Sequence, residues 1–518
     1  MYILTIISIS LICLSGLFAA YRHKMYFQQS SYFLSRYLKW LSGAFKTRSI
    51  VSFAAFILTL LFVVLEWAIP LFILALLSLV RIKTYANDKK KAIKKLVVTA
   101  RIKRLIFTES LLLVISVVAG AVVNPLLYII SATFSFITPS LLVISAVINK
   151  PIEVIGANYY INDAKRILKN HKGLKVIGIT GSYGKTGTKF ILGRILSESF
   201  NVLATPESFN TPMGIVRTVR EKMTAPTEIF IAEMGAKKKG DIKEICKICN
   251  PYIALITSVG PQHLDTFGSI ENVLKTKLEL ADWVEKKGGK SYLNSDNEYL
   301  MSKKKDYNAT LFGSNDVADV RVENISYGPT GLKFTLVKGE TEIPIHTRLL
   351  GRHNALNIAA AAAVALDLGE SKEDIAFAVS TLSPPPHRLQ MRPYINGSTL
   401  IDDAYNSNPE GCLEAVNVLG SFSGMKKIIV TPGLVELGKL EYECNKKLGI
   451  RAAEKCDEII LVGKKRSIPL MDGINEVGFM GKVTVVERFS DAAAMLNTIC
   501  DSNTVVLFEN DLPDNYAG

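Results

Sequence analysis

The segment that most constrains the fold lies between Gly178 and Thr188 and reads Gly-Ile-Thr-Gly-Ser-Tyr-Gly-Lys-Thr-Gly-Thr. It follows a short β-branched run and opens a helical one, which predicts a strand, a glycine-rich turn and a helix. The backbone N–H groups of such a turn, together with the helix N-terminus, hold phosphate oxygens. Ile179 stands where the strict pattern has a glycine, so the segment is a shorter variant, and a turn without a ligand is the alternative.

The side chains of this turn suit a nucleoside triphosphate such as ATP. Lys185 supplies a positive charge for the phosphates, and Thr186 supplies a hydroxyl oxygen for Mg²⁺. The remaining members of the predicted nucleotide-binding set come from the same turn and are Gly181, Ser182, Tyr183, Gly184 and Gly187.

Charge is divided unevenly along the 518 residues. Residues 1–150 contain 17 Lys and Arg against three acidic residues, and they therefore carry the whole net charge of +14. The basic residues lie in loops between apolar blocks, which is typical of the cytoplasmic flanks of membrane spans. Since residues 151–518 are neutral in sum, nucleic acid is not a predicted partner.

Three apolar blocks precede residue 150, at 1–20, 51–80 and 105–148. Their lengths predict an all-α transmembrane domain over residues 1–150 with about four or five helices, and the lipid bilayer as a partner. Because the basic loops should be cytoplasmic, we expect a multi-pass plasma-membrane protein whose catalytic domains lie in the cytoplasm.

Two features of these blocks leave alternatives open. Asn124-Pro125 predicts a turn halfway along the third block. The second block is short for two crossings, so a re-entrant hairpin around Glu66 and Pro70 is the alternative. Glu66 and Glu109 either have a function in apolar surroundings or belong to a plain anchor.

After Leu174 the sequence alternates β-branched runs with helical stretches, which predicts parallel α/β sheets. Glu233 follows the run at 229–232, and His263 follows the run at 253–258. Ligands of parallel sheets bind at the carboxyl ends of the strands, so both residues are candidate site residues. Four later runs, at 427–430, 458–462, 483–486 and 504–507, predict a second α/β domain.

Eight motifs occur in a fixed order after residue 150. They are Thr-Gly-Ser-Tyr-Gly-Lys-Thr at 180–186, Glu-Met-Gly-Ala at 233–236, Gly-Pro-Gln-His-Leu-Asp-Thr-Phe-Gly-Ser at 260–269, Lys-Leu-Glu at 277–279, Leu-Asn-Ser-Asp at 293–296, Gly-Arg-His-Asn-Ala-Leu-Asn at 351–357, His-Arg at 387–388 and Asp-Asp-Ala-Tyr-Asn-Ser-Asn-Pro at 402–409. Over roughly residues 151–500 the chain thereby resembles the Mur ligase family, and most of all its D-alanyl-D-alanine-adding members.

The resemblance implies a fold and an activity. The implied fold is a central P-loop, parallel-sheet ATP-binding domain at 151–389 and a Rossmann-like C-terminal domain at 390–518. The implied activity is ATP-dependent joining of a carboxylate to an amine through an acyl phosphate, in cell-wall peptide synthesis. The substrates are then a glycan-linked peptide carboxylate and an amino acid or peptide amine.

The resemblance also implies catalytic and metal-binding roles. Lys185 neutralises the phosphates, and Thr186 and Glu233 hold one Mg²⁺. His263 contacts a second Mg²⁺, although histidine is not a usual magnesium ligand and a structural hydrogen bond is the alternative. Lys277 corresponds to a lysine that the family carbamylates, with Lys275 or a plain surface lysine as alternatives.

Further residues match the family's nucleotide and substrate positions. By resemblance, Asn294, Asn354 and Asn357 lie near the nucleotide base, although helix capping and turn formation are the alternatives. Arg388 reaches the γ-phosphate, and Asp403 meets the ribose. The weaker substrate candidates are Asn210, Thr211, Asn406 and Asn408.

Two departures from the family concern the substrates. A predicted membrane domain replaces the usual uridine-nucleotide-binding domain, so the carboxylate substrate is either nucleotide-linked or lipid-linked. Near the C-terminus the family's Lys-Gly-Ser-Arg is replaced by an acidic segment at 508–516, which suggests a different amine. The competing hypotheses are a ligase for another envelope polymer, such as poly-γ-glutamate, and a nucleotide-gated membrane transporter or scaffold.

Overall fold

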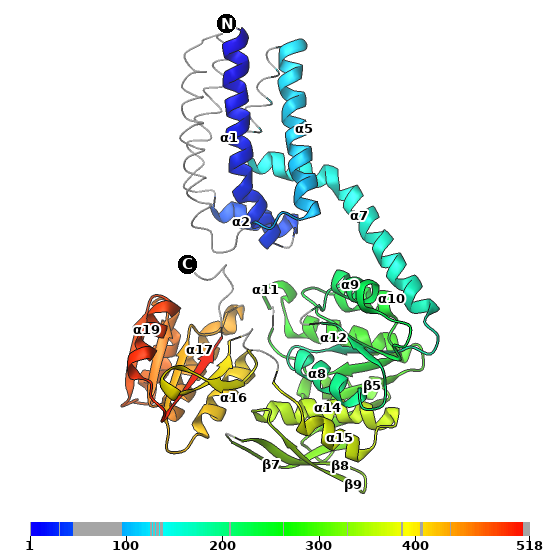
Figure 1. The fold of residues 1–518 in the computed structure, drawn as a ribbon, viewed down its shortest axis with the longest axis vertical. Coiled ribbons are helices and arrows are strands. Elements are labelled where there is room, and N and C mark those ends of the chain that lie inside the picture. Colours follow the sequence, from blue (N-terminus) through cyan, green and yellow to red (C-terminus); the bar gives the residue numbers. More distant parts are fainter. Residues whose placement is uncertain are drawn as a thin grey trace. The chain divides into compact units, whose positions relative to one another are not determined.

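The computed structural model contains two compact units, residues 1–159 and 160–518 (Figure 1). It describes residues 2–30, 32–44, 96–124, 127, 130, 134, 138–206, 209–262, 264–328, 330–384, 387–404, 408–435 and 437–510. The boundary between the units falls inside one long helix, α7, at Thr138–Asn170.

The first unit is helical in its described part. Its helices are α1 at Tyr2–Gln29, α2 at Leu34–Ala44, α5 at Ala100–Val122 and the first part of α7. Thr99 caps the N-terminus of α5, and its side chain accepts a hydrogen bond from the Ile102 N–H. Lys24 on α1 forms an ion pair with Glu109 on α5, and both side chains are buried.

Two described helices, α5 and α7, are long and apolar enough to cross a membrane by length and composition alone. Helix α5 ends at Val122, close to the turn predicted at Asn124-Pro125. The predicted spans at 51–80, with Glu66 and Pro70, lie outside the described residues. The four or five membrane helices therefore stay a prediction.

The second unit is built first around a nine-stranded sheet with the strand order β2-β3-β1-β4-β5-β6-β7-β8-β9. In this order, the neighbouring strands from β2 through β1 to β7 pair in parallel. The last two pairs, β7 with β8 and β8 with β9, are antiparallel. The strands are β1 at Lys175–Thr180, β2 at Val202–Ala204, β3 at Ile229–Glu233, β4 at Ile253–Ile256, β5 at Lys290–Asn294, β6 at Ala309–Gly313, β7 at Val320–Gly328, β8 at Gly331–Lys338 and β9 at Thr341–Thr347.

Alternate side chains of the strands feed two apolar layers, one on each face of the sheet. In β1, Ile177 and Ile179 belong to one core and Val176 to the other. The first core includes residues of α8 at Lys185–Leu196, α14 at Arg352–Leu368 and α15 at Lys372–Ser380. The second includes residues of α9 at Pro212–Lys222, α10 at Asp241–Cys249, α12 at Ile270–Glu285, the four-residue helices α11 (Leu264–Phe267) and α13 (Glu298–Met301), and the end of α7.

A six-stranded sheet forms the C-terminal part of this unit, with the order β10-β11-β15-β12-β13-β14. Only β10 runs antiparallel to its neighbour. The elements are β10 at Gln390–Pro393, β11 at Thr399–Asp403, α16 at Pro409–Gly420, β12 at Lys426–Thr431, α17 at Glu441–Lys455, β13 at Glu458–Val462, α18 at Ser467–Glu476, β14 at Lys482–Val486, α19 at Phe489–Ile499 and β15 at Thr504–Glu509.

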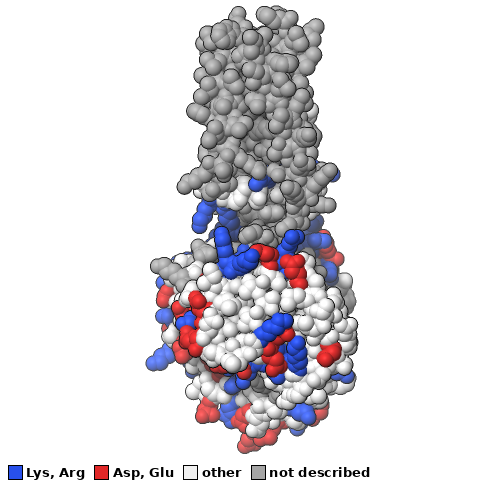
Figure 2. Space-filling view, turned by 90° about the vertical axis from the view of Figure 1, so that its left-hand side faces the viewer, with Lys and Arg blue, Asp and Glu red and all other residues white. Residues whose placement is uncertain are grey.

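The predicted parallel α/β runs are confirmed, but the sequence did not indicate the antiparallel extension. Every predicted run lies on an observed strand, with ends that agree within two residues. The β7–β9 extension alternates apolar and polar residues, as in the burial pattern of β9, and its inner face joins the first apolar core. Charges of both signs are interspersed over the visible face of this unit (Figure 2).

Candidate active site

The glycine-rich turn connects β1 to α8 at the carboxyl edge of the nine-stranded sheet. Gly181 and Gly184 have φ values of +153° and +80°, which L side chains rarely adopt. A Cβ at Gly181 would lie 2.0 Å from Thr257 Oγ1, and one at Gly184 would lie 2.6 Å from Asn357 Oδ1. Glycine is therefore required here both by the backbone conformation and by the close packing of the turn.

The segment after β4 holds this turn in place. Ser182 N–H donates to Ser258 O at 2.7 Å, and Tyr183 N–H donates to Ser258 Oγ at 3.0 Å. The Ser182 hydroxyl donates to Gly260 O at 3.1 Å, and the Tyr183 hydroxyl donates to Pro261 O at 3.1 Å. The N–H groups and the hydroxyls of Ser182 and Tyr183 thus fix the loop against the segment that follows β4.

Lys185 begins α8 and lies inside the turn. Its Nζ donates to Gly181 O at 2.6 Å and to Ser182 O at 2.9 Å. Burial lowers the pKa of Lys185 to about 8, although the carboxylate of Glu233 opposes the shift and the cation of Arg388 adds to it. A lysine held at this cost gains most from an anion, which is the behaviour expected of a phosphate-binding residue.

Glu233 ends β3 beside the turn, with only 1% of its side chain exposed. Its Oε1 accepts hydrogen bonds from Thr186 Oγ1 and from Asn210 Nδ2, both at 3.1 Å. Its Oε2 accepts from Lys189 Nζ at 2.9 Å. The structure therefore brings together Thr186 and Glu233, as predicted, and adds Asn210 and Lys189 to them.

The chemistry of these donors fits Mg²⁺. Thr186 and Glu233 present a hydroxyl and a carboxylate oxygen within 3.1 Å of each other, and Mg²⁺ prefers such hard oxygen ligands. Among the described residues, which do not include His263, no group of three or more His, Cys, Asp or Glu side chains is arranged so that it could hold a metal ion. Few protein ligands suit Mg²⁺, which keeps several waters and binds substrate phosphates.

Lys277 lies on α12 and is buried, with 2% exposed, whereas Lys275 is exposed. Burial lowers the pKa of Lys277 well below its usual range, the Lys185 cation lowers it further, and Asp241 and Glu279 oppose the shift. Glu279 itself accepts the N–H groups of Gly240 and Lys243, at 2.7 and 2.9 Å, at the start of α10. Of the two lysines, Lys277 therefore has the environment of a reactive amine.

The three predicted asparagines hydrogen-bond to the chain around them. Asn294 donates to Thr257 O at 2.8 Å and accepts from the Asp296 N–H at 2.9 Å, which joins the ends of β4 and β5. Asn357 accepts from Thr188 Oγ1 at 3.1 Å and donates to Asn354 Oδ1 at 3.3 Å. Asn354 and Asn357 thus pack α14 against the start of α8.

Arg388 and Asp403 lie near the start of the six-stranded sheet. Arg388 precedes its first strand, β10, and Asp403 ends β11. The neighbours of Arg388, His387 and Leu389, both have positive φ values, of 59° and 46°. The Leu389 N–H donates to Asp403 Oδ1 at 3.0 Å. Burial raises the pKa of Asp403 to about 6, and the Arg388 cation opposes this. The Arg388 cation also lowers the pKa of Lys185, so the arginine acts electrostatically on the glycine-rich turn.

The predicted substrate residues have different positions. Asn210 lies in the site through its contact with Glu233, and its carbonyl accepts the Gly235 N–H at 2.8 Å. Thr211 and Asn408 cap the N-termini of α9 and α16 through side-chain oxygens. Asn406 and His263 lie outside the described residues.

Sequence reasoning missed Lys189, Thr257 and Ser258. Lys189 lies four residues after Lys185 in a helix, so the spacing alone places the two lysines on one face of α8. Thr257 and Ser258 directly follow β4, at the end of the run at 253–258. Only the fold shows that they hydrogen-bond to the turn.

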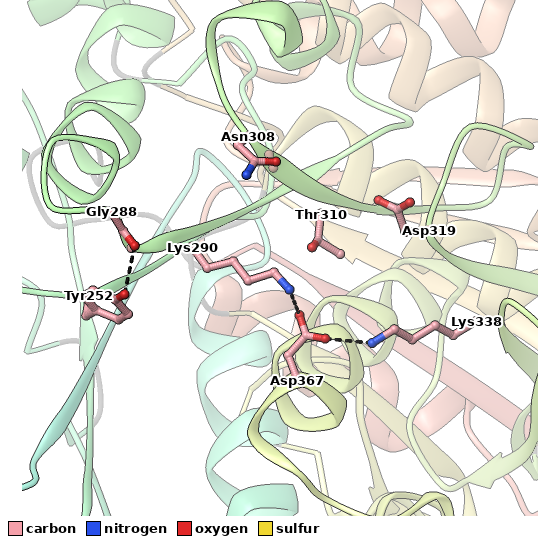
Figure 3. Close-up of a pocket in the computed structure, with 10 residues that line it drawn as sticks. Tyr252, Gly288, Lys290, Asn308, Thr310, Asp319, Lys338 and Asp367 are labelled. Atoms are coloured by element: carbon pink, nitrogen blue, oxygen red, sulfur yellow. Dashed lines mark hydrogen bonds and ion pairs between the residues drawn. The ribbon is translucent and has the colours of Figure 1, made fainter.

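A separate pocket of about 720 Å³ opens at the amino ends of strands β4 to β7, away from the carboxyl edge where the turn lies. Figure 3 shows Lys290 and Lys338 reaching the two oxygens of Asp367, with Nζ–Oδ distances of 2.5 and 2.8 Å. Tyr292 donates to Asp367 Oδ2 at 2.7 Å. These groups satisfy one another, and they tie α14 to β5 and β8.

Two family models match this chain. The Mur ligase middle domain matches residues 179–365, and the Mur ligase, glutamate ligase domain matches residues 387–509. The first match runs from the end of β1 into α14, and the second spans the six-stranded sheet. The chain belongs to the Mur ligase family.

Individual relatives agree with this assignment. The UDP-N-acetylmuramoyl-tripeptide–D-alanyl-D-alanine ligase of Bacillus subtilis is 33% identical over 294 residues, which are 56% of this chain and 63% of the relative. The Mycobacterium leprae ligase of the same name is 32% identical over 368 residues, which are 63% of this chain and 68% of the relative. The chain spans less than two thirds of the length of the Bacillus relative.

A solved structure shares the fold of the second unit. MurF ligase from Thermotoga maritima in complex with ADP is 27% identical, with a TM-score of 0.62, and the match covers 68% of this chain and 80% of that one.

Proposed function

We propose that this protein is an ATP-dependent carboxylate–amine ligase of the MurF type, acting in the synthesis of a peptidoglycan precursor. The observation that carries the proposal is the cluster of Lys185, Thr186 and Glu233 at the carboxyl edge of a Mur ligase sheet. The relatives named as D-alanyl-D-alanine ligases support the reaction class. Neither the other envelope polymer nor a nucleotide-gated transporter is favoured by these matches.

In the first step a substrate carboxylate oxygen attacks the γ-phosphorus of ATP, which forms an acyl phosphate and releases ADP. The barrier comes largely from bringing anions together, so this step needs charge neutralisation and in-line positioning. Lys185 and the amides of the turn would hold the phosphates, and Arg388 would add a second cation. Thr186 and Glu233 would hold one Mg²⁺, which when bound neutralises charge on the phosphate oxygens.

In the second step the amine nitrogen attacks the acyl carbon, the carbon–oxygen bond to phosphate breaks, and the amine loses a proton. The products are an amide and inorganic phosphate. The C-terminal domain would deliver the amine, as the family resemblance implies. The contact between the Arg352 N–H and Glu414 Oε1, which joins α14 to α16, supports a close approach of the two domains.

Carbamylation of Lys277 is part of the proposal. A neutral lysine nitrogen attacks CO₂ and loses a proton, which leaves a carbamate anion near the phosphate site. The burial of Lys277 and its lowered pKa favour the neutral amine that this reaction requires. A second Mg²⁺ site at His263 and this carbamate rests on the family resemblance.

We also propose that the first unit anchors the protein in the plasma membrane, with the second unit in the cytoplasm, and that the carboxylate substrate is lipid-linked. Helices α5 and α7 support the membrane anchor by length and composition, and the lipid-linked substrate follows from the anchor alone. The large apolar side chains exposed on α5, such as Phe107, Val114 and Val118, also support the anchor. The excess of positive charge in residues 1–150 supports a cytoplasmic position of the loops.

The test is substrate-dependent ADP release by the full-length protein in detergent. Uridine-linked and lipid-linked muramyl peptides are compared, each with D-alanyl-D-alanine and a panel of other amines. We expect release with the lipid-linked donor. Release with the uridine-linked donor alone would keep the ligase and overturn the lipid-linked substrate, and no release with any pair would overturn the proposed ligase.

A further inference from the structure

Lys189 is a buried cation that none of the predicted steps uses. It lies on α8 one helical turn after Lys185, its side chain is 0% exposed, and its Nζ donates to Glu233 Oε2 at 2.9 Å. Lys185 instead donates into the glycine-rich turn, to Gly181 O and Ser182 O. The two lysines of one helix face therefore serve different groups: Lys185 serves the phosphate-binding turn and Lys189 the carboxylate.

The two oxygens of Glu233 have separate partners. Oε2 accepts from Lys189, whereas Oε1 accepts from Thr186 and from Asn210, both at 3.1 Å. Because the side chain is 1% exposed, solvent cannot replace these partners. The contacts fix the rotation of the carboxylate group and direct Oε1 toward the same hydroxyl that suits a nucleotide-bound cation.

The orientation matters because cations differ in how they bind a carboxylate. Mg²⁺ demands near-octahedral geometry at about 2.0–2.1 Å, which favours one oxygen per carboxylate. Ca²⁺ is larger and often takes both oxygens, at about 2.3–2.6 Å. A lysine cation held on Oε2 competes with a metal ion for that oxygen, whereas the hydroxyl of Thr186, which suits the same ion, lies at Oε1.

We propose that Lys189 is a positioning residue that holds Glu233 as a one-oxygen ligand for nucleotide-bound Mg²⁺ and disfavours Ca²⁺. The inference rests on the proposed nucleotide-binding function and adds to it a residue that sets cation preference. Lys189 acts through Glu233, to which its Nζ donates a hydrogen bond.

The experiment measures binding of a fluorescent ADP analogue to the full-length protein in detergent, with EDTA, Mg²⁺ or Ca²⁺. For the natural sequence we expect Mg²⁺ to strengthen binding more than Ca²⁺ does. Lys189→Met should leave binding in EDTA unchanged, reduce the strengthening by Mg²⁺ about tenfold, and leave that by Ca²⁺ nearly unchanged, so that the preference for Mg²⁺ is lost. The matched control is Arg194→Met, which removes a surface ion pair with Glu198 from the same helix and should change none of these values.

A merely structural ion pair predicts a different result. Lys189→Met would then lower the thermal stability and keep the natural cation preference in the folded protein, which would overturn the inference.

If Lys189→Met does not fold, Glu233→Gln is compared with the double variant Lys189→Met/Glu233→Gln, which buries no unpaired charge at this pair. Equal affinities with Mg²⁺ support action through Glu233, and a further loss in the double variant overturns it. If Mg²⁺ does not strengthen nucleotide binding to the natural sequence, the proposed function itself fails.

Discussion

The two edges of the nine-stranded sheet both carry lysines and carboxylates, yet the two clusters differ in their electrostatics. At the carboxyl edge, burial lowers the pKa of Lys185 to about 8 and that of Lys277 well below its usual range. At the amino edge, burial opposes the ionisation of Asp367. Hydrogen bonds from Lys290, Lys338 and Tyr292 outweigh this effect and hold the pKa of Asp367 at about 2.

The difference separates the cluster to which we assign a function from a structural one. At the amino edge the charged groups stabilise one another, so their ionised forms favour folding. At the carboxyl edge the cations of Lys185 and Lys277 oppose folding, and they are retained in positions that suit a phosphate and a carbamate. A lysine–carboxylate cluster in a pocket is therefore weak support for function, whereas cations held at a cost beside a glycine-rich turn are strong support.

The largest expected effect belongs to Lys185. Lys185→Met should reduce substrate-dependent ADP release by about 10³-fold, because it removes a preorganised charge from the phosphate site. The folded pKa of about 8 lies below the unfolded value, so protonation of Lys185 disfavours the folded state at neutral pH, and stability rises as the pH rises from about 8 toward 10.4. The variant should lose this rise and be as stable at pH 7 as the natural protein, or more so. ADP release and thermal denaturation between pH 7 and 10 check both results.

A Lys185→Met protein that keeps its activity would contradict the phosphate-binding assignment. If Lys185→Met loses activity only because it unfolds at pH 7, Lys185 stabilises the fold, and the electrostatic difference between the two edges is contradicted. Lys290→Met, at the amino edge, is the matched control for loss of a lysine from this unit.

Lys277 is expected to have the second largest effect. Lys277→Ala should reduce activity by about 10²-fold, because it removes the proposed carbamate. This charged group would orient the reactants and would not itself hold the phosphates, so the loss should be smaller than for Lys185. Short carboxylic acids, such as acetate, should restore part of the activity by supplying the missing anion. Lys275→Ala is the control, because Lys275 is exposed on the same helix. If Lys277→Ala is as active as the natural protein, both in CO₂-free and in CO₂-containing buffer, the carbamate at Lys277 is contradicted.

Local pattern predicted much of this molecule. The strand–turn–helix at 175–196 and the strands of both sheets follow from β-branched runs and glycine spacing, and the positions of Lys185, Thr186 and Glu233 follow from the ends of those runs. Tertiary partners could not be predicted in this way. Three contacts of the site join residues that are 44 to 169 positions apart in the sequence, and only the packing of helices on the sheet brings them together. They are Lys189 with Glu233, Thr257 with Tyr183, and Asn357 with Thr188.

The antiparallel strands β7 to β9 show a second limit. Their sequence alternates at period two, but nothing local indicates that they extend the same sheet as the P-loop strands. The capping roles of Thr211 and Asn408 show a third. Each side chain has the chemistry of a substrate ligand, and it also has the chemistry of an N-cap, in which the structure places it.

At the amino edge, Asp367→Asn should lower the free energy of unfolding at pH 7 by about 1–2 kcal/mol, because a pKa of about 2 in the folded state lies about two units below the unfolded value. The carboxylate is stabilising above the unfolded pKa, and this contribution disappears as the pH falls through the folded pKa. The difference between variant and natural protein should therefore shrink between about pH 4 and 2. Denaturant unfolding at several pH values measures it, while ADP release at pH 7 should stay unchanged. Loss of activity in a folded Asp367→Asn protein would show that the pocket has a function.

The smallest expected effect belongs to Tyr292, whose hydroxyl donates to Asp367 Oδ2 at 2.7 Å. Tyr292→Phe keeps the buried ring and removes one hydrogen bond to a charged group, which predicts a loss of about 1 kcal/mol or less in the free energy of unfolding, since two lysines still bind the carboxylate. In the Asp367→Asn background the same change should cost less, because the charge that strengthens the bond is gone. A double-mutant cycle by denaturant unfolding measures this coupling. Equal costs in both backgrounds would mean that the Tyr292 hydroxyl contributes independently of the Asp367 charge, and that the lysines alone stabilise the ionised carboxylate.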